Sequence, residues 1–250
     1  MTSNRVLFLP LKLARKIRDF IYKEVSPNAV LTARLKSRLR SEYESGQIKI
    51  VFDIGAHKGE WASEIKNLMP NARMILFEAN PIHSEVLKSK GFEYHIGILS
   101  KPGVKQCTFF SPDEHSSSTG ASYYKEVTKL FDSVEGVELA AGTLADIVSK
   151  AALPQPDFIK IDTQGSEIDI MSGGVDIFKQ ARLVLIELPI IECNHDAPAL
   201  DAYLNCMSEL GFLPIELCEI HKFGQVVIQV DILFQRKDTI DASILEILRH

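Results

Sequence analysis

The sequence predicts an α/β fold in which a mostly parallel sheet carries helices on its faces. From residue 48 onward, short apolar segments alternate with segments whose apolar residues recur at helical spacing. This alternation is typical of βαβ units. The last two apolar segments, 212–217 and 226–236, are joined by a short loop. Because parallel strands need a long crossover, we expect these last two strands to be antiparallel.

The elements of the first half have clear boundaries in the sequence. The run IKIVFDIG is continuously apolar, as expected for a strand buried on both faces. Pro70 ends the following helix, and Asn80 can cap a helix whose first residue is Pro81. We therefore expect strands at 48–55, 73–79 and 94–100, and helices at 60–69 and 81–91.

The second half is less regular, because a polar loop at 111–122 interrupts the alternation. Thr143 can cap a helix, and a further helix precedes the antiparallel pair. The patterns predict an extra strand at 104–110, a fourth strand at 156–162 and a fifth at 181–190. They predict helices at 123–131, 144–153, 167–178 and 200–211.

The first 46 residues are predicted to form a basic helical extension to a domain that covers 47–250. Residues 1–50 hold eleven Lys or Arg and four Asp or Glu, a balance of +7. The whole chain carries −5, so residues 51–250 carry −12. An acidic body of this kind is a poor nucleic-acid surface, and no nucleic-acid partner is expected.

Two basic helical stretches are expected in this extension, at 10–25 and 31–46. The first is amphipathic, with Leu13, Ile17, Phe20 and Ile21 on one face. Either both helices pack on the domain as a lid, or the first lies on an anionic membrane surface through residues 1–25. No apolar run approaches the roughly 20 residues of a spanning helix.

The four cysteines indicate a reducing compartment. They form no C-x-x-C pair, and no histidine stands at zinc-finger spacing from them. We therefore interpret them as reduced thiols of a cytoplasmic protein, which would be peripheral at the inner membrane face if the first helix binds lipid.

The turn after the first strand is the candidate cofactor site, because ligands bind at the carboxyl edge of such sheets. Gly55 and Gly59 match only part of the G-x-G-x-x-G pattern of dinucleotide sites. Asp53 would repel a pyrophosphate but suits the cationic amino-acid end of S-adenosylmethionine. Alternatively, Asp53 only ties the turn to neighbouring N–H groups. Glu78, at the end of the second strand, can accept hydrogen bonds from ribose hydroxyls in either kind of cofactor.

S-adenosylmethionine is therefore the expected cofactor, and S-adenosylhomocysteine the expected product. Two other interpretations stay open at this point, an NAD-dependent oxidoreductase and a catalytically silent scaffold that binds the cofactor. The residues expected to bind the cofactor are Asp53, Gly55, Ala56, His57, Gly59, Glu78, Ala79, Ser100 and Asp162.

Several segments together resemble the FkbM-type methyltransferases. They are, in order, FDIGAHKGEW, LFEANP, GILS, TLADIV, DFIKIDTQGSEIDIMSGG and LVLIEL, and they span roughly residues 48 to 236. The most specific piece is KIDTQGSE at 160–167. The resemblance implies a class I methyltransferase (Rossmann-like) sandwich whose seven-stranded sheet has one antiparallel strand near the edge. It also implies O-methylation of a hydroxyl on a sugar, a glycan or a related natural product.

The fourth strand is the candidate catalytic element. Asp162 ends this strand, and Lys160 points to the same side of it. Methyl transfer to an alcohol needs removal of a proton, so Asp162 is the first candidate for the base or for orienting the acceptor. His57 and His115 are further candidates for the base.

The acceptor is expected to contact His115, Gln164 and Glu187. No metal site is predicted, although a site built from Asp162, Glu187 and His195 remains an alternative. A D-P-P-Y-like tetrad is absent after the fourth strand, where DTQG stands instead. This disfavours a nucleic-acid base as the acceptor.

Overall fold

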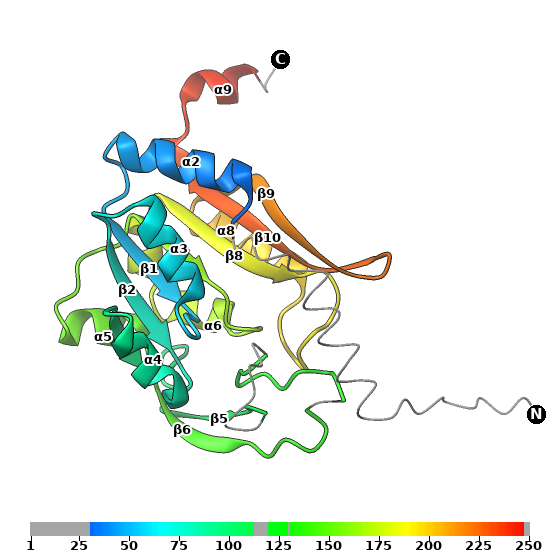
Figure 1. Cartoon of the computed structure of the whole chain (residues 1–250). Helices are drawn as coiled ribbons and strands as arrows, with labels where there is room; N and C mark the ends of the chain where they lie inside the picture. Colours follow the sequence, from blue (N-terminus) through cyan, green and yellow to red (C-terminus); the bar gives the residue numbers. More distant parts are fainter. Residues whose placement is uncertain (1–30, 113–119, 130, 248–250) are drawn as a thin grey trace, which may run out of the picture.

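The computed structural model describes residues 31–112, 120–129 and 131–247 (Figure 1). Its centre is a seven-stranded sheet with the order β3-β2-β1-β7-β8-β10-β9. All neighbouring strands are parallel except that β10 is antiparallel to both β8 and β9. The predicted sheet, with one antiparallel strand near its edge, is confirmed. Its strands are β1 (Ile50–Ile54), β2 (Arg73–Glu78), β3 (Glu93–Ile96), β7 (Phe158–Ile161), β8 (Leu183–Pro189), β9 (Phe212–Phe223) and β10 (Val226–Arg236).

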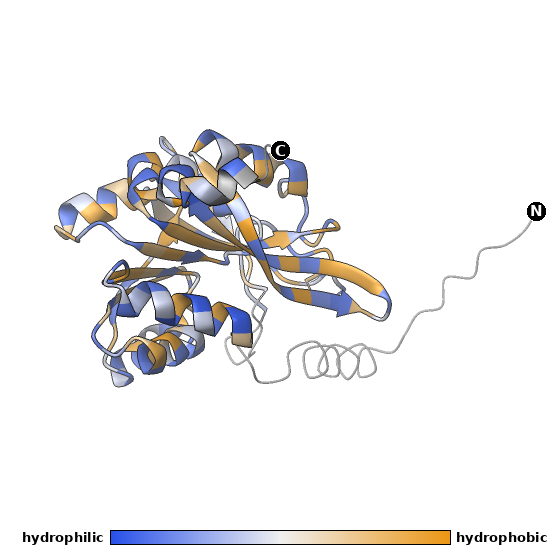
Figure 2. Ribbon diagram, turned by 90° about the horizontal axis from the view of Figure 1, so that it is seen from above, coloured by the Kyte–Doolittle hydropathy of each residue, from blue (hydrophilic) through white to orange (hydrophobic). Residues whose placement is uncertain are grey.

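Helices cover both faces of this sheet, and each face has its own hydrophobic core. One core joins buried side chains of α2 (Ala33–Glu44), α3 (Glu60–Leu68) and α4 (Ser84–Ser89) to the sheet. The other joins α5 (Leu144–Lys150), α6 (Glu167–Ser172), α7 (Val175–Gln180) and α8 (Leu200–Glu209) to the opposite face. Figure 2 shows the mostly hydrophobic strands lying between helices that alternate in hydropathy. A last helix, α9 (Ala242–Ile247), follows the sheet.

The helix α2 confirms the second predicted helix of the extension. Leu35 and Leu39 are buried against the domain. At the end of the helix, Glu42 accepts a hydrogen bond of 2.7 Å from Arg182, just before β8 begins. The helix is therefore bonded near the amino ends of the strands, away from the carboxyl edge, so it is not a lid over the predicted site. The first predicted helix, 10–25, lies outside the described residues.

The segment between β3 and α5 differs most from the prediction. The expected extra strand is present as β5 (Gln106–Phe109), but it belongs to a second sheet of order β4-β6-β5. In this sheet β4 (Ile98–Leu99) is parallel to β6 (Val137–Gly142), and β5 is antiparallel to it. The β6 strand was not predicted.

The predicted helix at 123–131 is wrong. The described residues there form turns and one isolated bridge to Asn194. Tertiary contacts override the helical pattern, because the hydroxyls of Tyr123 and Tyr124 both donate to the carboxylate of Asp169.

The single helix predicted at 167–178 is also wrong, because two short helices, α6 and α7, occupy this segment. They are separated by Gly173 and Gly174. A Cβ on Gly173 would lie 2.3 Å from the backbone oxygen of Ser100, so close packing requires glycine where the helix breaks.

No helix within the described ranges has the length and apolar character needed to cross a membrane.

Candidate active site at the carboxyl edge of the sheet

The glycine turn is held in place by the neighbouring strands. Gly55 has a φ of 82°, and a Cβ at this position would lie 1.9 Å from the backbone oxygen of Asp162. Gly55 is therefore required by the close approach of the end of β7. Gly59 has a φ of 71° and caps α3, and its missing Cβ leaves room for the side chains of Leu87 and Phe92. Both glycines serve the packing of the turn itself, a reason that the motif alone did not indicate.

Glu78 holds the same turn from the end of β2. Its Oε2 accepts a 2.6 Å hydrogen bond from the backbone N–H of His57, and its Oε1 accepts one of 2.8 Å from Asn80. Burial raises the pKa of this carboxyl group. Each oxygen has a second lone pair, so Glu78 can also accept hydrogen bonds from two ribose hydroxyls, as predicted.

A cavity lies beside this turn and is the candidate cofactor site. Of the predicted cofactor residues, Gly55, His57, Glu78, Ala79 and Asp162 line it. Its volume is about 60 Å³, whereas ligand pockets measure roughly 300–1,000 Å³. The cavity wall also contains residues that were not predicted, including His83, Gly97, Leu99, Phe109 and Tyr123.

The other predicted cofactor residues lie behind the cavity wall. Ala56 and Gly59 are buried in the turn, and the backbone N–H of Ser100 donates to Gly142. Asp53 has no exposed surface and does not line the cavity. Direct contact of these residues with the cofactor stays a prediction that this conformation does not show.

Asp53 instead faces Lys160, which also contacts Asp162. The Lys160 ammonium lies 3.7 Å from Asp53 Oδ1 and 3.1 Å from Asp162 Oδ2, and it lies 3.4 Å from the backbone oxygen of Gly55. Burial raises the pKa of Asp53 to about 6, although Lys160 opposes this shift. The pKa of Asp162 is lowered, because the contacts with Lys160 and Gln164 outweigh the effect of burial. Asp162 is thus held ionised at neutral pH.

Gln164 connects this cavity to a second one. Its side-chain amide donates to Asp162 at 2.9 Å and to Glu187 at 2.7 Å, and it has an uncommon φ of 56°. Gln164 lines both cavities, whereas Glu187 and Gln229 line the second, which has a volume of about 260 Å³. Gln229 also donates to Glu187, at 2.6 Å. The predicted acceptor residues Gln164 and Glu187 are therefore together, next to the predicted catalytic Asp162.

The remaining candidates for catalysis are placed differently. His57 lines the cofactor cavity, where its ring packs against His83 with centroids 4.3 Å apart. His115 lies outside the described residues. His195 is exposed and bonded through its backbone to Lys125, so its side chain does not join Glu187 in the alternative metal site.

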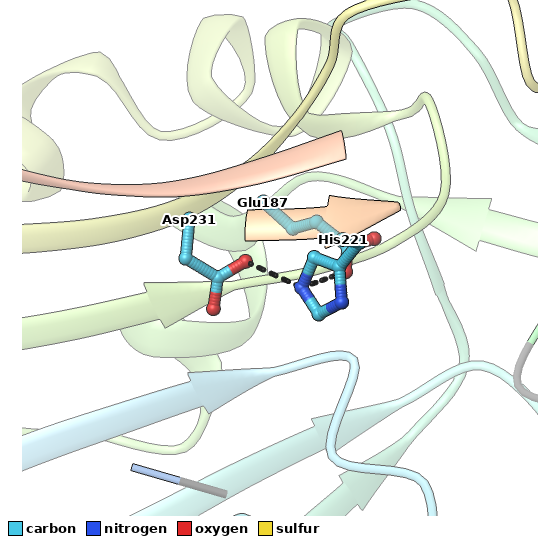
Figure 3. Close-up of side chains that lie close together, drawn as sticks. All are labelled: Glu187, His221 and Asp231. Atoms are coloured by element: carbon cyan, nitrogen blue, oxygen red, sulfur yellow. Dashed lines mark ion pairs between the residues drawn. The ribbon is translucent and has the colours of Figure 1, made fainter. Parts of the chain in front are cut away.

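Glu187 instead lies beside two residues that the sequence reasoning missed, His221 and Asp231 (Figure 3). Burial, together with the charges of Asp162 and Asp231, raises the pKa of Glu187 well above its usual range. A signal for Asp231 was available in the sequence. Gln229 and Asp231 alternate with apolar residues in β10, which places both polar side chains on one face.

The comparisons with known proteins point to one family. The family model described as the methyltransferase FkbM domain matches residues 53–214, which is more than half of the chain. No curated protein matches the sequence.

Solved structures are similar to this chain at low identity. The cofactor-bound protein Rv0187 from MTB is 16% identical with a TM-score of 0.47, and the match covers 90% of this chain and 88% of that one. The magnesium protoporphyrin IX methyltransferase from Synechocystis PCC 6803 is 8% identical with a TM-score of 0.46, covering 90% and 91%. The precorrin-6y C5,15-methyltransferase from Geobacter metallireducens GS-15 is 14% identical with a TM-score of 0.42, covering 85% and 92%. These proteins are too distant to indicate a substrate.

Proposed function

Because the chain belongs to the FkbM methyltransferase family and uses S-adenosylmethionine, we propose that it methylates a hydroxyl group of a sugar or glycan. The observation that carries this proposal is the position of Gln164 between the cofactor cavity and the second cavity. A methyl donor on one side of Gln164 and an acceptor on the other would meet at the carboxyl edge of β7.

The lining of the second cavity suits a carbohydrate. Glu187 accepts hydrogen bonds, and the amides of Gln164 and Gln229 can both donate and accept them. Sugar hydroxyls also do both. Apolar residues on the same wall, such as Ile190, Pro198 and Leu200, suit the C–H faces of a sugar ring.

The cofactor supplies the reactive group, and the side chains of this protein orient the acceptor. The cofactor supplies a methyl group activated by the positive charge of its sulfonium. The acceptor oxygen would bond to that methyl carbon as the carbon–sulfur bond breaks, and its proton would pass to the Asp162 carboxylate and from there to solvent. Asp162 accepts the hydrogen bond of this hydroxyl and orients it. Lys160 keeps Asp162 ionised, and the lowered pKa favours this orienting role over that of a strong base.

Labelled cofactor provides the test. Full-length protein would be incubated with methyl-labelled S-adenosylmethionine and with extracted polysaccharides, lipids and small metabolites. We expect label in the sugar fraction, as a methyl ether that survives alkali. Label on nitrogen or carbon would contradict the proposal. Cofactor binding without any transfer in these pools would favour the catalytically silent scaffold.

We also propose that the enzyme is cytoplasmic and that residues 1–25 hold it at an anionic membrane surface, where a lipid-linked glycan is presented. The support is the +7 balance of residues 1–50 and the amphipathic pattern of 10–25. Each Lys or Arg near such a surface contributes about 1 kcal/mol. Full-length protein should float with anionic vesicles at low salt, less so at high salt, and a variant without residues 1–25 should not. Equal flotation of both forms would contradict this location.

A further inference from the structure

Three polar side chains converge where β8, β9 and β10 lie side by side. His221 Nε2 lies 3.4 Å from Asp231 Oδ1 and 3.6 Å from Glu187 Oε2 (Figure 3). The sheet register explains the convergence. Asp231 is opposite both Glu187 on β8 and Glu219 on β9, and His221 stands two residues beyond Glu219 on the same face of the sheet.

The hydrogen bonding of this group is incomplete. His221 Nε2 and Asp231 Oδ1 are both buried atoms without a hydrogen-bond partner among the described residues. Their separation of 3.4 Å exceeds the usual 2.7–3.2 Å of an N–H···O bond. Buried polar atoms of this kind call for a further partner.

The separations suit atoms that share one metal ion. Ligand atoms bound at about 2.0–2.2 Å around a tetrahedral zinc ion lie roughly 3.3–3.6 Å apart. The two separations at His221, 3.4 and 3.6 Å, fall in this range. All three ligand atoms lie within 4.8 Å of one another.

The local charge favours a cation as well. Glu187 and Asp231 lie opposite each other in the sheet, and His221 is the one basic side chain that forms ion pairs with them within the described chain. Two carboxylates therefore exceed the single positive charge that His221 can supply. A divalent cation would remove this imbalance.

Glu187 is already oriented for such a role. The amides of Gln164 and Gln229 both donate to its Oε1, which leaves Oε2 directed toward His221. Hydrogen bonds that fix a ligating carboxylate in this way are a general feature of metal sites.

We propose that Glu187, His221 and Asp231 bind one divalent transition-metal ion. One imidazole and two carboxylates suit Zn²⁺ or Mn²⁺ better than Mg²⁺, which prefers oxygen ligands alone. Three protein ligands leave a coordination position for water or substrate. Since Glu187 also lines the second cavity, a hydroxyl of the acceptor could occupy that position and lose its proton more readily. This last step rests on the proposed function, but the metal site itself does not.

The test is metal binding by the untagged full-length protein, without cofactor or acceptor. After treatment with a chelator and dialysis, the protein would be titrated calorimetrically with ZnCl₂, MnCl₂ and MgCl₂. We expect one Zn²⁺ or Mn²⁺ per chain and much weaker binding of Mg²⁺. His221→Gln and Asp231→Asn should each weaken binding at least tenfold. Glu219→Gln is the matched control, because Glu219 neighbours Asp231 but lies outside the group, and it should change affinity less than threefold.

Two further measurements keep the test decisive if a variant does not fold. Co²⁺ added to the wild type should give the visible absorption bands of a tetrahedral nitrogen–oxygen site. Gln229→Ala, which removes one support of Glu187, should weaken Zn²⁺ binding by about 10-fold or more. The absence of stoichiometric binding to the wild type, or unchanged binding in His221→Gln and Asp231→Asn, would overturn the metal site. Methyl transfer by a protein that binds no metal would overturn this inference alone and leave the proposed function intact.

Discussion

The two halves of the central sheet place different basic side chains beside their buried carboxylates. Around β1, β2 and β7, the carboxylates of Asp53 and Asp162 share the ammonium of Lys160. Around β8, β9 and β10, the carboxylates of Glu187 and Asp231 share the imidazole of His221. Each half therefore sets two carboxylates against one basic side chain, an ammonium in the first half (the cofactor half) and an imidazole in the second (the acceptor half). An imidazole that gives up its proton can bind a metal ion, whereas an ammonium group cannot, and this difference is the basis of the metal site proposed above.

Asp162 stands at the boundary between the halves, and its replacement should have the largest effect. Asp162→Asn keeps the shape of the side chain but removes the charge that orients the acceptor. We expect turnover to fall by about 10²–10⁴, with the dissociation constant for S-adenosylmethionine changed by less than about threefold. Single-turnover kinetics and calorimetry measure the two quantities. Asp176→Asn, on the exposed side of α7, is the control. Full activity in Asp162→Asn would reassign the role, and His57 would be tested next.

His83 should make the cofactor half sensitive to acid. Burial, together with the charges of His57 and Lys58, lowers its pKa from 6.5 to about 4. The unfolded chain therefore binds a proton more readily, and stability is lost as the pH falls from about 6.5 toward 4. We expect a loss of about 1–3 kcal/mol in the free energy of unfolding, allowing for partial solvent screening.

Thermal or urea unfolding at pH 7 and pH 5 tests this sensitivity. In His83→Gln the difference in stability between the two pH values should shrink, while the exposed His195→Gln should behave as the wild type. An equal loss of stability in all three proteins would show that His83 is not its source.

Replacement of Gln229 tests the acceptor half of the sheet and should have a smaller effect than replacement of Asp162. Gln229→Ala removes one hydrogen bond to Glu187 and one polar group of the second cavity. We expect the KM for the acceptor to rise about 2–10-fold, since one such hydrogen bond contributes roughly 0.5–1.5 kcal/mol, and cofactor affinity to stay unchanged. Gln225→Ala, in the exposed hairpin turn, is the matched control. A loss of cofactor affinity in Gln229→Ala would break the division into two halves.

The cofactor half could be predicted from sequence because its signals are local. Gly55, Gly59 and Glu78 fall within one strand–helix–strand unit, and the alternation of apolar segments indicates where each strand ends. The reason for Gly55 could not be predicted. It depends on the backbone of Asp162, more than a hundred residues away, reaching the turn.

The acceptor half could be predicted only in part, because its contacts depend on register. Glu187 was expected at the carboxyl edge, but its neighbours His221 and Asp231 meet it only through the pairing of three strands. The failed helix at 123–131 has a similar cause. Its tyrosines bond to Asp169, a partner that no local pattern indicates.

The central claim is that the cofactor binds in the half around β1, β2 and β7 and the acceptor in the other half. Calorimetry with S-adenosylhomocysteine on the wild type, Glu78→Ala and Gln229→Ala tests it most directly. We expect micromolar binding by the wild type and by Gln229→Ala, and binding weaker by about 2–4 kcal/mol in Glu78→Ala, since two charge-assisted hydrogen bonds to ribose are lost. Unchanged binding in Glu78→Ala, or tighter binding of NAD than of S-adenosylhomocysteine, would contradict the account.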